Sequence, residues 1–148
     1  MNKLAAVVTD IEQTDIVTYI TLDCNDTPIR LIKTKTPVWA GVGDRVYFTF
    51  QEASVCVSKE CPGKVSIENR VPGTLKKIRS KDSLCELTFE SGIGTVVSLV
   101  TEKACDELGL EEGCSATILL RGVDIHLEPN VDPMNLESLK RPGTKLAN

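Results

Sequence analysis

The side chains that most often carry catalysis are scarce in this chain of 148 residues. Its single histidine, His126, lies between Ile125 and Leu127 in a run typical of a β-strand. A serine or cysteine nucleophile needs a base such as histidine beside it. Strand alternation, however, turns His126 away from the face shared by Val123 and Ile125. We therefore expect a solvent-facing histidine, no catalytic residue and no enzyme.

The six cysteines could in principle bind a metal or form disulfides. None are spaced as C-x-x-C, and the closest pair, Cys56 and Cys61, has four residues between its members. Five of the six lie within or beside apolar runs, so we expect free thiols in or near the core and no metal site.

Sequence signals exclude several other classes of protein. No G-x-x-x-x-G-K-[ST] motif is present, so the chain is not an ATPase of the P-loop type, and we expect no organic cofactor. No apolar run approaches the ~20 residues that span a bilayer. Asp10 and Glu12 interrupt the first apolar stretch too early for a signal peptide. We expect a cytoplasmic protein with no membrane partner.

The composition is that of a soluble globular protein, with 41% hydrophobic and 26% charged residues. Lys+Arg 17 against Asp+Glu 21 gives a net charge of -4, and aromatic residues make up only 4%. Nucleic-acid binding relies on basic and aromatic side chains together, so we expect no nucleic-acid partner.

Short β-rich runs separated by polar turns dominate the chain, which predicts an all-β protein. The expected strands are 4–11, 16–22, 29–32, 45–50 and 54–58, then 73–78, 84–89, 95–100, 115–120 and 123–127. One helix is expected after residue 100, where Thr101 is a plausible N-cap and Gly109 ends the helical pattern.

The two sets of strands form an internal repeat. An offset of 70 residues places Gly43 on Gly113, and an offset of 71 places Leu4 on Leu75. The repeat predicts two tandem domains, 1–60 and 66–128, each an OB-like five-stranded barrel with at most one short helix. A tail, 129–148, follows, and it is either disordered or docked on a neighbouring subunit.

The second half resembles the molybdate-binding Mop domain, a member of the TOBE group. The resemblance lies in SLVTEKACDELGLEEGCSATILLRGVDIHL, with its threonine-led helix and ELGL, and in SIENRVPG, which is similar to the family's opening Ser-Ala-Arg-Asn before a glycine. More weakly, VGDRVYFTFQEASVCVSKE resembles the last strands of TOBE domains in ABC-importer ATPases. Such domains imply an oligomer, most simply a homotrimer of di-domain chains.

The resemblance also implies a set of oxyanion contacts in the second half. Molybdate and tungstate are tetrahedral dianions that backbone N–H groups, hydroxyls and a few cationic side chains can hold. The implied contacts are Ser66, Asn69, Thr101, Lys103, Arg121 and Gly122. In the first half the candidates are fewer: Asn2, Lys33, Thr34 and Gln51. Taken without the resemblance, Thr101 is a plain helix cap.

Three residues depart from the family's pattern near these contacts. Glu68 stands where the family has arginine, and we expect it to turn outward or to be neutralised by Arg70. Ala104 replaces a serine, and Val123 replaces a small residue. Two functions therefore remain open: molybdate or tungstate binding for storage or homeostasis, or a TOBE-type assembly module that has lost oxyanion binding.

Overall fold

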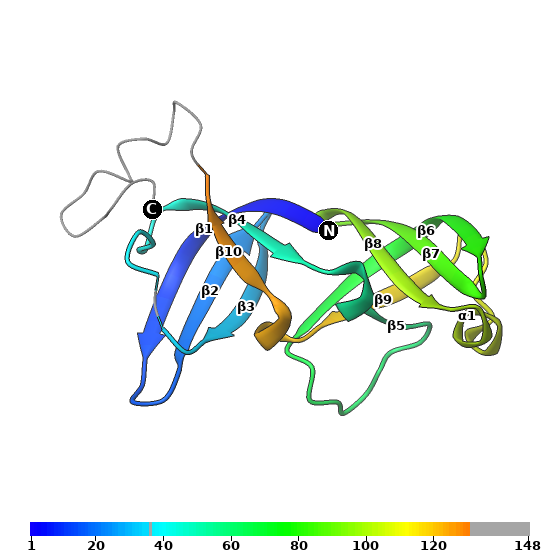
Figure 1. Ribbon diagram of the computed structural model, residues 1–148, viewed down its shortest axis with the longest axis horizontal. Helices are drawn as coiled ribbons and strands as arrows, with labels where there is room; N and C mark the ends of the chain where they lie inside the picture. Colours follow the sequence, from blue (N-terminus) through cyan, green and yellow to red (C-terminus); the bar gives the residue numbers. More distant parts are fainter. Residues whose placement is uncertain (36, 131–148) are drawn as a thin grey trace.

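The computed structural model describes residues 1–35 and 37–130, which form two five-stranded antiparallel sheets set end to end (Figure 1). The first sheet has the strand order β10-β4-β1-β2-β3 and the second has β5-β9-β6-β7-β8. The strands are β1 (Asn2–Gln13), β2 (Thr18–Cys24), β3 (Thr27–Lys33), β4 (Arg45–Phe50), β5 (Cys56–Ser58), β6 (Asn69–Lys81), β7 (Leu84–Ser91), β8 (Gly94–Thr101), β9 (Ser115–Leu120) and β10 (His126–Pro129). The predicted tail lies, from residue 131 onward, outside the described residues.

The all-β class with two five-stranded units is confirmed, and so is the helix after residue 100. Helix α1 (Glu102–Leu108) begins where the Thr101 hydroxyl accepts a hydrogen bond from the Ala104 N–H at 3.0 Å. It ends at Gly109, whose φ of 63° is the left-handed conformation that glycine adopts readily. Residue types alone therefore located both ends of α1.

A short 3-10 turn precedes the last strand of each half, and the sequence did not predict it. These turns are η1 (Glu52–Ser54) and η2 (Gly122–Asp124). Ser54 and Val123 were expected to begin strands, which is wrong. Because Val123 lies in a turn, it is 52% exposed while Ile125 is buried, and the two side chains do not share a face.

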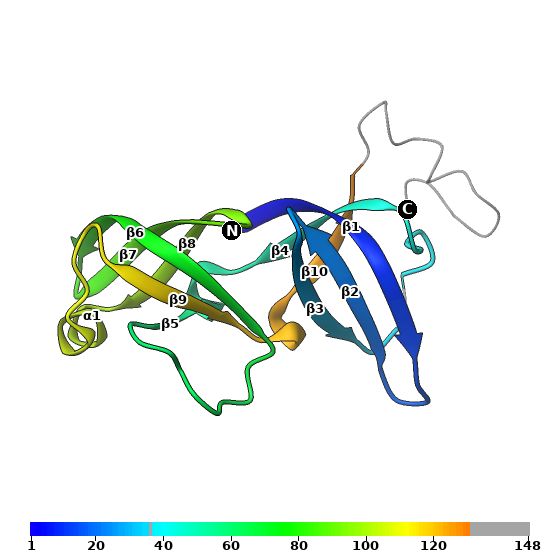
Figure 2. The same ribbon diagram turned by 180° about the vertical axis from the view of Figure 1, so that it is seen from behind.

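Each half gives its last strand to the other sheet. Strand β5 pairs with β9, and β10 pairs with β4, both antiparallel. In Figures 1 and 2 the orange β10 lies against the first sheet, and β5 lies beside β9 in the second. The predicted division into 1–60 and 66–128 follows the linear order of the chain, whereas the sheets exchange these two strands.

The repeat is visible in equivalent turns of the two halves. The number of residues that separates equivalent positions changes along the chain. Gly43 and Gly113 both have φ of 92°, and their N–H groups donate to the carbonyl oxygens of Val8 and Leu75. The offset of 70 is therefore confirmed for the two glycines. The offset of 71 for the first strands is wrong, because Val8 corresponds to Leu75, 67 positions away. The extra residues before Gly113 hold α1.

The core of both sheets consists mainly of aliphatic side chains, as expected from the low aromatic content. Phe48, Phe50 and Phe89 are the largest fully buried residues. The buried thiols are Cys24, Cys85 and Cys105, whereas Cys56 and Cys61 are exposed. Burial, with a hydrogen bond to Cys85, raises the pKa of the Cys105 thiol to about 11, so this thiol stays protonated at neutral pH.

No group of three or more histidine, cysteine, aspartate or glutamate side chains among the described residues could hold a metal ion. No helix within residues 1–35 and 37–130 is long and apolar enough to cross a membrane.

Candidate functional site

Asn69, at the start of β6, joins the two sheets through its buried side-chain amide. Its Oδ1 accepts a hydrogen bond from the Arg30 N–H of β3 at 2.7 Å. Its Nδ2 donates to the carbonyl oxygens of Arg30 at 2.8 Å and of Leu120 at 3.0 Å. Both N–H groups of the amide are thus used, so this side chain has no donor left for an anion.

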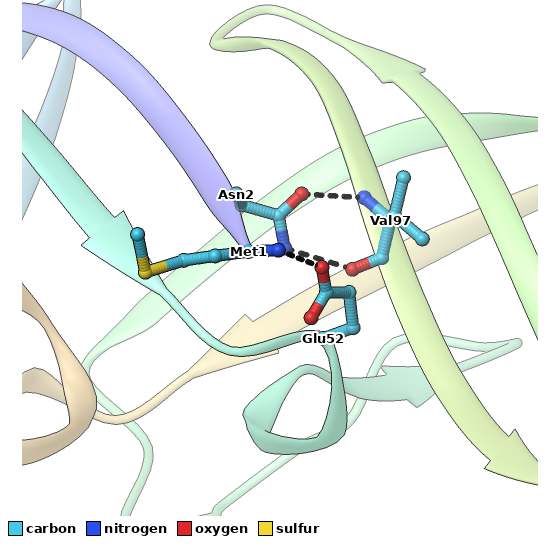
Figure 3. A network of polar contacts seen from close by, with 4 residues as sticks. All are labelled: Met1, Asn2, Glu52 and Val97. Atoms are coloured by element: carbon cyan, nitrogen blue, oxygen red, sulfur yellow. Dashed lines mark hydrogen bonds and ion pairs between the residues drawn. The ribbon is translucent and has the colours of Figure 1, made fainter.

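Asn2 makes the equivalent contact at the start of β1 (Figure 3). Its Oδ1 accepts from the Val97 N–H of β8 at 2.8 Å, and its Nδ2 donates to the Val97 carbonyl oxygen at 2.9 Å. The ammonium group of Met1 contacts the Glu52 carboxylate beside it (Figure 3). The two asparagines therefore bind the two sheets together from opposite directions.

Glu68 lies next to Asn69 and occupies a backbone donor of η2. The Gly122 N–H donates to the Glu68 carboxylate at 3.0 Å. The Arg70 guanidinium instead donates to the backbone carbonyls of Gly63, Val65 and Ile67. The expected neutralisation of Glu68 by Arg70 is therefore wrong, because the loop carbonyls take up the guanidinium.

Gly122 is required at its position by the close approach of η2 to β3. A Cβ atom added there would lie 2.9 Å from the Arg30 carbonyl oxygen and 3.2 Å from the Leu31 Cα. The preceding residue, Arg121, is 59% exposed at its side chain, and its Nε donates to Asp124 Oδ2 at 2.9 Å. This bond uses one of five N–H donors, so the guanidinium can still bind an anion.

Ser66 is exposed in the segment 59–68, two residues before Glu68. Glu68 contacts Gly122 of η2, and Arg121 directly precedes Gly122. We call these four residues the η2 group.

Thr101 and Lys103 lie at the other end of the second sheet. Asn69 begins β6, whereas Thr101 pairs with Leu84, which pairs with Lys81 at the far end of β6. In Figure 1 helix α1 lies at the outer end of the molecule, away from η2. Within one chain the predicted contacts therefore fall into two separate sets.

The surroundings of Thr101 are acidic. A surface depression here is lined by Ser83, Thr101, Glu102, Lys103, Asp106 and Glu107. Lys103 is 85% exposed at its side chain and lies 3.9 Å from the Glu107 carboxylate. Three carboxylates against one ammonium repel a dianion, so this set needs cations from elsewhere to bind one.

The sequence did not predict the approach of Lys33 to His126. The Lys33 Nζ of β3 lies 3.1 Å from the His126 Nδ1 of β10. Burial lowers the pKa of the Lys33 ammonium. His126 is exposed, as predicted. The proximity of Lys33 to His126 could not be inferred from the sequence, because the contact exists only through the exchange of β10 into the first sheet.

Residues 65–127 match the family model of the TOBE domain. The match to the TOBE domain is thus confined to the second half of the chain.

Among solved structures, the chain is similar to the cytoplasmic molybdate-binding protein ModG in a form with molybdate bound. The TM-score is 0.81 at 20% sequence identity, covering 86% of this chain and 95% of ModG. No curated protein sequence matches the chain. At this identity the similarity establishes the fold, two ModG-like five-stranded units.

Proposed function

We propose that this protein binds molybdate or tungstate in the cytoplasm, for storage or homeostasis of the oxyanion and without catalysis. The observation that carries the proposal is the Gly122 N–H, which already has an anionic acceptor 3.0 Å away in Glu68. A backbone donor that holds a carboxylate can hold a tetrahedral oxyanion instead. The guanidinium of the preceding residue, Arg121, supplies positive charge, part of which Asp124 offsets at 2.9 Å.

The remaining donors come from a neighbouring subunit in this proposal. Thr101 and Lys103 lie too far from the η2 group to share an ion within one chain, and carboxylates surround them. An Arg121 from a second copy would balance that acidity. The proposed assembly is a homotrimer, and light scattering should then return about three times the chain mass of 16.1 kDa. A monomer at micromolar concentration would argue against both the trimer and the shared site.

Replacing Arg121 by alanine is expected to weaken molybdate binding about tenfold or more, a loss of about 1.4 kcal/mol or greater. The change removes the cation beside the Gly122 N–H. Isothermal titration with molybdate, tungstate and sulfate measures the effect. Lys64→Ala is the matched control, since Lys64 is an exposed cation of the nearby segment 59–68. Equal affinity of Arg121→Ala and the parent would refute the site.

A second candidate function is a TOBE-type module for assembly alone. It is favoured by the Glu68 carboxylate, which fills the Gly122 donor and repels a dianion. In this alternative the parent protein gives no heat with any of the three oxyanions while still forming the oligomer. Titration and light scattering on one sample therefore separate the two functions.

A further inference from the structure

Lys33 and His126 form a pair of basic side chains that the η2 group does not use. The pair joins the end of β3 to the start of β10, with Lys33 Nζ 3.1 Å from His126 Nδ1. At this distance an ammonium can donate a hydrogen bond to an imidazole nitrogen that carries no proton. Two like charges at this separation repel, and an anion between or beside them would offset that repulsion.

The strands around the pair bring no carboxylate to it. Thr18 of β2 lies directly opposite Lys33, and Thr49 of β4 lies directly opposite His126. Strands β3 and β4 contain no acidic residue, and the one acid of β2, Asp23, is at the opposite end of that strand, facing Pro28.

The acids on the η2–β10 segment already have cationic partners. Asp124 pairs with Arg121 at 2.9 Å, and Glu128 pairs with Lys3 at 3.4 Å. Glu68, which lies outside this segment, accepts a hydrogen bond from the uncharged Gly122 N–H. Within residues 1–35 and 37–130, Lys33 therefore makes no ion pair. A half-buried ammonium without a counter-charge is costly, and an external anion would relieve that cost.

The equivalent place in the other half of the repeat has no such pair of basic side chains. The position of Lys33 corresponds to Val100 in β8, and the position of His126 corresponds to Cys56 in β5. The equivalent crossing of η1 over β8 thus carries an apolar side chain and a thiol. The fold does not require a basic pair at this crossing, so the pair calls for an explanation other than packing.

We propose that Lys33 and His126 form an anion subsite, separate from the η2 group, that takes a tetrahedral oxyanion dianion of the molybdate class. The bound ion accepts hydrogen bonds from the ammonium and from the imidazolium, and His126 takes up one proton from solvent as the ion binds. The proposal rests on the proposed function only for the choice of molybdate as the probe.

The test follows the ring resonance of His126 by NMR, which is unambiguous because the chain has one histidine. Molybdate is titrated into the full chain between about pH 6 and 8.5, where an imidazole changes charge. The resonance should shift saturably, and the apparent pKa of His126 should rise by about 0.5 unit or more when molybdate is bound.

Matched variants separate this subsite from the η2 group. Lys33→Met should abolish the shift, Lys33→Arg should retain it, and Lys64→Met, an exposed control, should leave it unchanged. Arg121→Ala should keep the His126 shift while losing most of the calorimetric binding. A His126 resonance that stays fixed while calorimetry records binding overturns the subsite and leaves the proposed function standing. Equal shifts in Lys33→Met and the parent also overturn it.

Discussion

Replacing Asn69 by alanine is expected to lower the free energy of unfolding by about 3 kcal/mol. The change leaves the N–H and the carbonyl of Arg30 and the carbonyl of Leu120 without their side-chain partner. A buried polar group that loses its hydrogen bond costs about 1–3 kcal/mol, and water entering the gap offsets part of the sum. The loss also weakens the contact between the two sheets.

Urea unfolding followed by circular dichroism measures this effect. Asn2→Ala is the natural comparison, since Asn2 makes two such bonds instead of three. We expect it to cost less, about 2 kcal/mol. If Asn69→Ala changed the unfolding free energy by less than about 1 kcal/mol, the amide would be dispensable for holding the sheets together.

Replacing Glu68 by arginine is expected to tighten molybdate binding about tenfold or more, a gain of about 1.4 kcal/mol or greater. The substitution removes the carboxylate that occupies the Gly122 N–H. It also places a cation near the Arg121 guanidinium, where a dianion can bridge the two. Each unit of charge changed near a bound ion at a protein surface is worth up to about 4 kcal/mol at 4 Å, so tenfold is a conservative estimate.

Isothermal titration of three variants checks this expectation. Glu68→Gln removes the charge but keeps an acceptor, so its affinity should fall between those of the parent and Glu68→Arg. Glu60→Arg makes the same charge change at an exposed position of the same segment, and it should leave the affinity near that of the parent. Equal gains from Glu60→Arg and Glu68→Arg would mean that only net charge matters.

The elements of the fold were predictable because their signals are local. Short β-rich runs separated by polar turns located all ten strands to within a few positions, and Thr101 and Gly109 marked the ends of α1. The exchange of β5 and β10 was not predictable in this way. Both strands are short, and nothing in their alternation distinguishes the edge of one sheet from the edge of the other.

The candidate site was predictable only as a set of residues. The resemblance to Mop domains selected Arg121 and Gly122, whose donors contact Asp124 and Glu68 in the structure. The engagement of the Asn69 amide and the contact of Glu68 with Gly122 depend on how η2 packs against β3. Such contacts arise from tertiary packing between distant segments, which spacing along the chain does not encode.

Because each half gives its last strand to the other sheet, the two halves of this one chain pair as two strand-exchanged subunits of a dimer would. Either half alone would lack the strand that the other half supplies and would leave an open edge, which a second copy could cover. During synthesis the edge of β4 has no partner until the residues of β10 emerge, long after the rest of the first sheet. The first half therefore remains vulnerable to aggregation until the second half has been made.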